Sequence, residues 1–221
     1  MDTSEKLLID IEGKNQPAVY YFKPEVKVVF AGKNIVPLPE NEKNLKIYKL
    51  LEDNCDLIFC TTQNLDDFQF YPVPCFWIFA VDSEGNCFGT IGDMGGMQDE
   101  NCPVGYVNHE GMYGKIADNL KEFLELITFY PYWRDIIRYE QVDASYDINA
   151  IGLKKVENEC QYLKNQGEIA EILKLSKNPS SIDLLISNIK SISDFVVYES
   201  KAEAQTQNTF LDENFFDSIT N

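Results

Sequence analysis

The stretch of sequence that decides the fold is Cys-Phe-Trp-Ile-Phe-Ala-Val at residues 75–81. A continuous apolar run of this kind is typical of a strand that is buried on both faces in the middle of a sheet. The acidic, glycine-containing stretch Asp82-Ser83-Glu84-Gly85-Asn86 follows it and leads into a second strand-like run at residues 87–91. Two such runs around a glycine-containing loop predict a β-hairpin, which we expect at the centre of the fold.

Shorter strand-like segments lie on both sides of this hairpin. The loop Gly92-Asp93-Met94-Gly95-Gly96 and a strand candidate at residues 104–109 follow it, so this region is predicted to form a meander. Upstream, β-branched and aromatic runs predict strands at residues 18–22, 26–30, 57–60 and 68–71.

Helices are predicted before and after the meander. Apolar side chains at helical spacing favour a helix over residues 42–53. A second helix is expected to begin at Asn119, a good N-cap, because Glu122 three residues later completes a capping-box pattern. Pro131 ends that segment.

The character of the chain changes at about residue 143, where amphipathic segments replace the β-branched runs. Helices are predicted over residues 153–165, 168–177 and 181–194, with breaks at Gly167 and at Asn178-Pro179. These helices either dock on the sheet or form a small helical subdomain. We therefore expect an α+β domain with a central, mostly antiparallel sheet over residues 1–142, a helical extension over 143–199, and an acidic, aromatic tail over 200–221.

The charge of the chain is strongly one-sided in its centre. Between Leu50 and Gly114 there are eleven acidic residues and no lysine or arginine, within a chain of formal net charge −17. A one-signed segment can generate a field that steers a basic partner. The alternative is a solvated acidic face that only keeps the protein soluble.

Composition argues against several classes of protein. Nucleic-acid and anionic-membrane binding need clustered basic residues, which the centre of the chain lacks. No apolar run approaches the ~18 residues of a membrane-spanning helix. The start Met1-Asp2-Thr3-Ser4-Glu5 has no signal-peptide character, so we expect a cytoplasmic protein. Six cysteines without a Cys-x-x-Cys pair, and a single histidine, predict no disulfide framework, metal site or cofactor.

A family resemblance rests on motifs in the same central region. They are the strand ending in Phe79-Ala80, the turn Asp82-Ser83-Glu84-Gly85, the strand running into Gly92-Asp93, and the block Ile116-Ala117-Asp118-Asn119-Leu120-Lys121-Glu122-Phe123-Leu124. Pro37-Leu38-Pro39 precedes the first predicted helix in a similar way. These motifs resemble the SUKH superfamily, which includes yeast glucan-synthesis regulators and many bacterial immunity proteins. Leu120 stands where an aromatic residue is commoner in that family.

Membership of this superfamily would imply an α+β fold, no catalytic activity and a role in binding another protein. Bacterial members are associated with toxin systems, in which a small protein binds and blocks a cognate toxin, often a nuclease. An acidic protein suits such a partner because nuclease active-site clefts are basic. The implied mechanism is electrostatic steering followed by occlusion.

The candidate partner-binding residues are acidic side chains of the predicted turns and loops: Asp82, Glu84, Asp93, Asp99, Glu100 and Glu110. Asp93, Asp99 and Glu100 lie in or beside a long glycine-containing loop, a composition typical of binding surfaces. For Asp82 and Glu84 the alternative is that they only solvate the turn and bond its backbone.

Other functions remain open from the sequence. A regulatory or scaffold module would use the same fold to bind a host protein. A hydrolase could use His109 with Glu110, Asp93 or Asp99 as an acid–base pair and Cys87 or Cys102 as nucleophile. However, the chain has no Gly-x-Ser-x-Gly, His-Glu-x-x-His or phosphate-loop motif. The stretch Tyr130-Pro131-Tyr132-Trp133-Arg134-Asp135, which combines three aromatic residues with an arginine, is either a binding hot spot or a cap over the end of the sheet.

Overall fold

The computed structural model describes residues 33–34, 45–59, 70–74, 76–92, 102–142, 145–152, 159–191, 195–200 and 202–204. The strands predicted at residues 18–22 and 26–30, the loop residues 93–101 and the tail beyond residue 204 lie outside these ranges.

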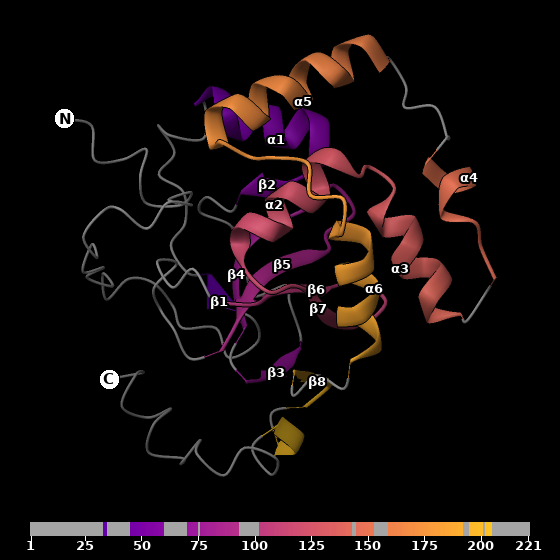
Figure 1. Cartoon of the computed structure of the whole chain (residues 1–221). Coiled ribbons are helices and arrows are strands. Elements are labelled where there is room, and N and C mark those ends of the chain that lie inside the picture. The colour runs from indigo at the N-terminus through magenta and orange to yellow at the C-terminus, as the bar shows by residue number, and fades with distance from the viewer. Residues whose placement is uncertain are drawn as a thin grey trace.

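The centre of the molecule is a mostly antiparallel sheet (Figure 1). Its strands lie in the order β1 (Lys33–Asn34), β4 (Phe76–Val81), β5 (Cys87–Ile91), β6 (Val104–Val107) and β7 (Tyr113–Ala117). The short β2 (Ile58–Phe59) also pairs with β4. Only the β1–β4 pair is parallel among these strands. The α+β class and the central hairpin predicted from the sequence are confirmed.

Strand β4 is buried on both faces, as its apolar run predicts. Phe79 and Ala80 belong to the main core cluster, whereas Phe76, Ile78 and Val81 belong to a second cluster. The register with β5 shifts between Ile78 and Ala80. A bulge at this point breaks the strict alternation of faces, so two successive side chains enter the main core.

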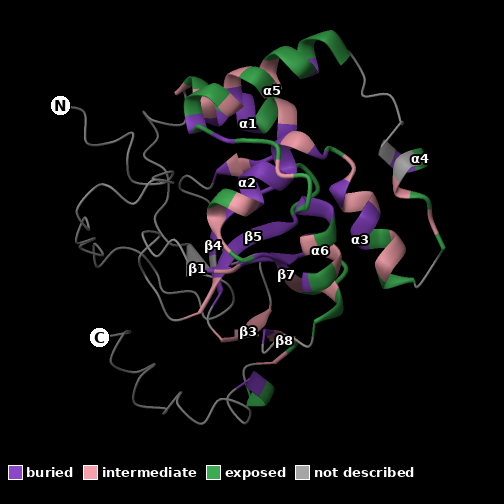
Figure 2. Cartoon of the chain, viewed as in Figure 1, coloured by how far each residue is buried: buried purple, intermediate pink, exposed green. Residues whose placement is uncertain are grey.

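Helices α1 (Lys46–Cys55), α2 (Leu120–Phe129) and α5 (Glu159–Leu173) pack together over the main core (Figure 1). The predicted N-cap of α2 is confirmed, because Asn119 Oδ1 accepts from the backbone N–H of Glu122 at 2.9 Å. The sides of α2 and β5 that meet are purple, and hence buried, in Figure 2.

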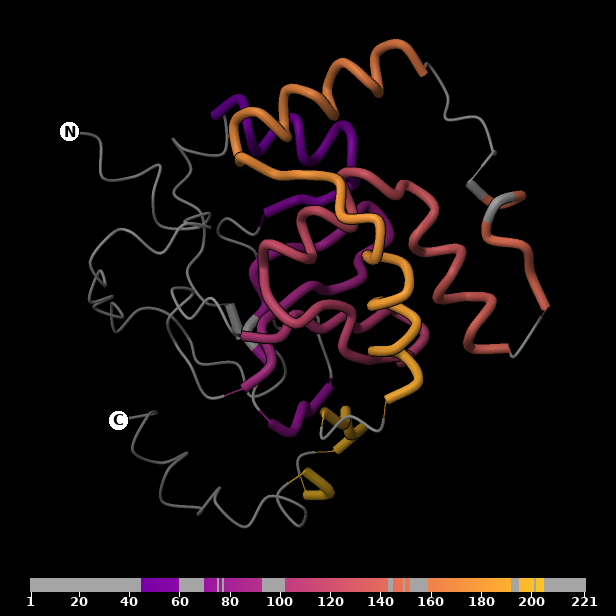
Figure 3. The backbone as a smooth tube through the Cα atoms, in the orientation of Figure 1, coloured from indigo at the N-terminus to yellow at the C-terminus, as the bar shows by residue number. Residues whose placement is uncertain are grey.

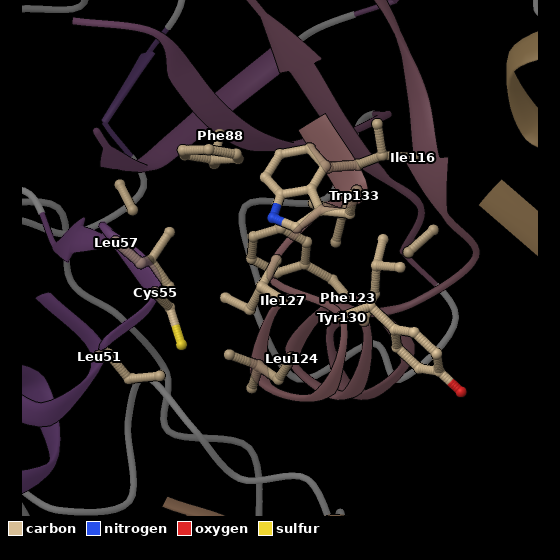
Figure 4. Packing of buried hydrophobic residues seen from close by; sticks show 14 of the residues in the cluster. Leu51, Cys55, Leu57, Phe88, Ile116, Phe123, Leu124, Ile127, Tyr130 and Trp133 are labelled. Atoms are coloured by element: carbon tan, nitrogen blue, oxygen red, sulfur yellow. The ribbon is translucent and has the colours of Figure 1, made fainter. Parts of the chain in front are cut away.

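Strand β7 and helix α3 (Trp133–Gln141) were not expected from the sequence. Ile116, which precedes the predicted N-cap Asn119, lies in β7. Trp133 begins α3 and is 1% exposed, and its ring lies beside Phe88 at a centroid distance of 6.1 Å (Figure 4). The aromatic stretch at residues 130–133 therefore contributes to the core, which supports the interpretation as a cap over the sheet.

The helical extension docks on the sheet domain and shares its core. Ile169 of α5 and Leu185 of α6 (Ser181–Lys190) are fully buried in the main cluster. The predicted break at Gly167 is wrong, because α5 continues through it. Residues 174–180 then run along α2 (Figure 3), where Tyr130 Oη donates to the carbonyl of Asn178 at 2.6 Å.

An ion pair joins α6 of the helical extension to α3. Lys190 Nζ of α6 lies 2.8 Å from Glu140 Oε2 of α3, and this bond lowers the pKa of the Glu140 carboxyl.

The short α4 (Ile148–Gly152) follows α3. Strand β8 (Val196–Tyr198), which was not predicted, pairs with β3 (Tyr71–Val73) in a separate two-stranded sheet. In the described ranges, none of the helices has the length and apolar character needed to cross a membrane.

The close packing of β5 and β6 gives a stability prediction at Gly105. A Cβ atom there would lie 2.9 Å from Ile91 Cγ1 and 3.0 Å from Phe76 Cε2, so Gly105→Ala forces the buried Phe76 and the half-buried Ile91 to move. We expect a loss of about 1–3 kcal/mol in the free energy of unfolding, measured by chemical denaturation.

Gly114→Ala is the matched control, because a Cβ atom there meets nothing within 4 Å and the residue lies in the neighbouring strand β7. It should leave the stability within about 1 kcal/mol of the parent. Equal losses in the two variants would contradict the assigned packing.

Candidate functional site

Two hairpin turns with the same backbone bonding lie at one end of the sheet, and we name residues 82–86 and 108–112 the twin turns. In the first, Gly85 N donates to Asp82 O at 3.0 Å and Asp82 N donates to Asn86 O at 3.0 Å. In the second, Gly111 N donates to Asn108 O at 3.1 Å and Asn108 N donates to Met112 O at 2.8 Å. Each turn has glycine in fourth position, with φ of 84° and 83°, a conformation that other residues rarely adopt.

The first residue of each turn holds the backbone of the third and fifth residues. Asp82 Oδ1 accepts from the backbone N–H groups of Glu84 at 3.1 Å and Asn86 at 2.9 Å. Asn108 Oδ1 does the same for Glu110 at 3.1 Å and Met112 at 2.8 Å. Such Asx bonds are a common way to stabilise a tight turn. Glu84 and Glu110 consequently occupy equivalent positions.

The side chain of Asn86 joins the twin turns. Its Oδ1 accepts from both the backbone N–H and the ring Nδ1 of His109, each at 3.0 Å. Its Nδ2 donates to Asp82 Oδ2 at 2.8 Å and lies 3.4 Å from Glu84 Oε2. Because an amide oxygen only accepts, His109 Nδ1 carries the proton in this bond.

Helix α3 contributes a buried ion pair to the first turn. Arg134 Nη2 lies 3.3 Å from Asp82 Oδ2, whose side chain is 1% exposed, and 3.9 Å from Asp56 Oδ2. The Arg134 guanidinium also lies over the Trp133 ring, 4.6 Å from its centroid. Asp56, at the end of α1, in turn accepts from Ser83 N and Ser83 Oγ at 3.0 Å. The first turn is thereby fixed to two helices.

A pocket of about 470 Å³ lies between the twin turns and α3. It is lined by Glu84, Asn86, Tyr106, Asn108, His109, Glu110, Met112, Arg134, Ile137, Arg138, Gln141 and Val142. Burial, together with the nearby Asp82 carboxylate, raises the pKa of Tyr106 to about 12, so its hydroxyl stays protonated near neutral pH. The pocket thus combines carboxylates, guanidinium groups, an imidazole and a phenol with an apolar wall.

The structure brings together three of the predicted partner-binding residues and assigns them different roles. Glu84 has a side chain that is 55% exposed, and Glu110 is also exposed, so both carboxylates are accessible. Asp82 is not, because its carboxylate is buried and bonded to the turn backbone, Asn86 and Arg134. The prediction that Asp82 contacts a partner directly is therefore corrected: Asp82 positions the turn.

Asp93, Asp99 and Glu100 lie outside the described residues. The described ends of β5 and β6 that flank this stretch, at Thr90 and Val104, pair with each other. Cys87 and Val107, at the other ends of the same strands, pair next to the twin turns. The flanks of the acidic loop therefore lie at the end of this strand pair opposite to the twin turns.

Of the residues proposed for hydrolase chemistry, the structure describes His109, Glu110, Cys87 and Cys102. His109 Nδ1 bonds to the Asn86 amide and not to a carboxylate. Cys87 and Cys102 are buried and do not line the pocket. Within the described ranges, no group of three or more His, Cys, Asp or Glu side chains is arranged to hold a metal ion.

Arg138 and Asn86 are site residues that sequence reasoning missed, whereas Arg134 was predicted only as part of the aromatic stretch at residues 130–135. The two arginines depend on α3, whose signal was the apolar spacing of Trp133, Ile136 and Ile137 on one helical face. The signal for the twin turns was the pattern Asp/Asn-x-Glu-Gly, which occurs at Asp82 and again at Asn108.

The unequal burial of the two Asx residues gives a prediction about the twin turns. Asp82→Ala leaves buried donors of Asn86 and Arg134 without their acceptor, so we expect a loss of about 2–4 kcal/mol in unfolding free energy. Asn108→Ala removes the equivalent bonds from a half-buried turn and should cost about 0.5–1.5 kcal/mol.

Chemical denaturation of both variants measures the difference. Losses of equal size would show that the ion pair with Arg134 adds nothing to the turn.

Comparison of the chain with protein-family models, with curated proteins and with solved structures found no match.

Proposed function

We propose that this chain is a non-enzymatic protein-binding module that captures a basic protein through the acidic side chains of the twin turns. The observation that carries the proposal is the pair Glu84 and Glu110. Both are exposed carboxylates in the third position of cross-linked turns, and both line one pocket. We further propose that the partner is a cognate toxin and that the chain acts as a bacterial immunity protein, as the SUKH-like motifs suggest.

Preorganisation favours binding at this site. Asp82, Asn108 and Asn86 fix the turn backbones. Only the side-chain torsion angles of the two glutamates therefore lose freedom when a partner binds. Less ordering means that more of the interaction energy is available for affinity. The net charge of −17 adds long-range attraction for a basic partner and accelerates encounter.

The arginines of α3 modify this electrostatic argument. The pocket is not purely acidic, because Arg138 Nη2 lies 4.0 Å from Glu84 Oε2. Arg134 is neutralised locally by Asp82 and Asp56. A partner must therefore present cations where the glutamates are, and a mixed pattern of this kind favours selectivity over general attraction to any basic protein.

Charge reversal tests the proposal. The partner is sought as a toxin encoded beside this gene, and its growth inhibition is measured with and without the chain. We expect the parent chain to relieve the inhibition. Glu84→Lys/Glu110→Lys should slow association with the purified toxin by at least about tenfold, and the Kd of the parent should rise with salt between roughly 50 and 300 mM.

The matched control is Glu52→Lys/Glu171→Lys, which changes the net charge equally on exposed positions of α1 and α5. It should slow association much less. The triple variant Asp93→Lys/Asp99→Lys/Glu100→Lys separately tests the acidic loop, where we also expect at least about tenfold slower association. A salt-independent Kd and unchanged rates in all variants would refute the proposal. Capture of a host protein without toxicity would favour a regulatory module.

A further inference from the structure

The residues that line the pocket differ in polarity from one wall to the other. Hydrogen-bond acceptors come from the twin turns, where Glu84 and Glu110 supply carboxylates. An apolar wall comes from Met112 in the second turn and from Ile137 and Val142 at α3 and its end. Val142 is 71% exposed.

In the described part of the chain, the cations already present leave Glu110 available, whereas Glu84 Oε2 forms an ion pair with Arg138 at 4.0 Å and accepts from Asn86 Nδ2 at 3.4 Å. Arg134 is held by Asp82 and Asp56 and by the Trp133 ring. Arg138 is 65% exposed and stays at 4.0 Å from Glu84, beyond hydrogen-bond distance. Within the described residues, no lysine or arginine forms an ion pair with Glu110.

We propose that the pocket takes one basic side chain of the partner, arginine or lysine, as the anchor of the complex. The methylene groups of that side chain would pack on Met112, Ile137 and Val142, while its cationic head would lie between Glu84 and Glu110. Long basic side chains combine an apolar stem with a charged head, which matches this division of the walls. A volume of about 470 Å³ is sufficient for one such side chain.

This inference rests on the proposed function and deepens it, because it names the chemical group that the site recognises. It also explains why the two glutamates must be held at equivalent positions. A guanidinium has five donors and can bond two carboxylates at once, whereas a single glutamate would leave part of it unsatisfied.

The test uses the full chain and a short probe. The acetylated, amidated peptide Gly-Arg-Gly is titrated into the ¹⁵N-labelled protein, and amide chemical shifts are followed by NMR. The comparison peptide has citrulline in place of arginine, which keeps the shape and removes the charge. We expect saturable shifts at Asn86, His109 and Glu110, with a Kd in roughly the millimolar range for a single side chain. The citrulline peptide should bind at least about fivefold more weakly.

The variant Glu84→Gln/Glu110→Gln keeps the size and hydrogen-bonding ability of both side chains and removes their charge. It should raise the Kd of the arginine peptide by at least about fivefold. Glu171→Gln on α5, which does not line the pocket, is the control and should bind like the parent. An unchanged melting temperature shows that each variant is folded. Equal binding of the two peptides, shifts located away from the pocket, or no effect of the double Gln variant would overturn the inference.

The two proposals fail in different ways. If Glu84→Lys/Glu110→Lys slows association with a basic toxin as expected but the arginine and citrulline peptides bind equally, the anchor pocket is refuted and the proposed function stands. If the peptide binds as expected but no basic protein is captured, the proposed function is refuted and the pocket remains a site for a cationic side chain.

Discussion

The side-chain amide of Asn86 holds the two hairpin turns together, because its oxygen accepts from His109 twice and its nitrogen donates to the first turn. Asn86 is 1% exposed, so these bonds form away from water, where an unpaired amide would cost about 1–3 kcal/mol. Through them the second turn is placed relative to Asp82, and the His109 tautomer is set. The pocket depends on this one residue, since both of its acidic walls move if the turns separate.

The buried carboxylate of Asp82 extends the same constraint to the helices. A buried charge is tolerated only when it is paired and fully hydrogen-bonded, and here Arg134 supplies the opposite charge from α3. The carboxylate therefore requires α3 to lie where it does, and α3 brings Arg138, Ile137 and the pocket wall with it. Lys190 and Glu140 connect α3 to α6, so the helical extension supports the site although none of its described residues lines the pocket.

The sequence was most informative where local chemistry alone determines structure. The apolar run at residues 75–81, the glycine turn after it and the Asn119 cap each gave correct elements, since each depends on neighbouring residues. Long-range pairing was not accessible: β7 contains Gly114 and Lys115 and forms a strand because β6 lies beside it. The continuation of α5 through Gly167 depends in the same way on packing against α1 and α2, which outweighs the low helix propensity of glycine. Because α3 was missed, the acidic segment seemed free of basic neighbours, and the mixed charge of the pocket could not be predicted.

The residues of the twin turns have different structural roles, which explains why the two glutamates are candidates for binding a partner. In both turns the first residue satisfies the backbone and the fourth supplies the left-handed conformation, so the fold does not need an acid in third position. Many residues could stand there at little cost to stability, because the third side chain makes few internal contacts. Glutamate occurs in both turns, on the same pocket, next to an apolar wall in which Val142 is exposed. The turns do not require these two acids for folding, but the hydrogen bonds that the turns do require hold them in place. This is the arrangement expected of a preorganised binding site.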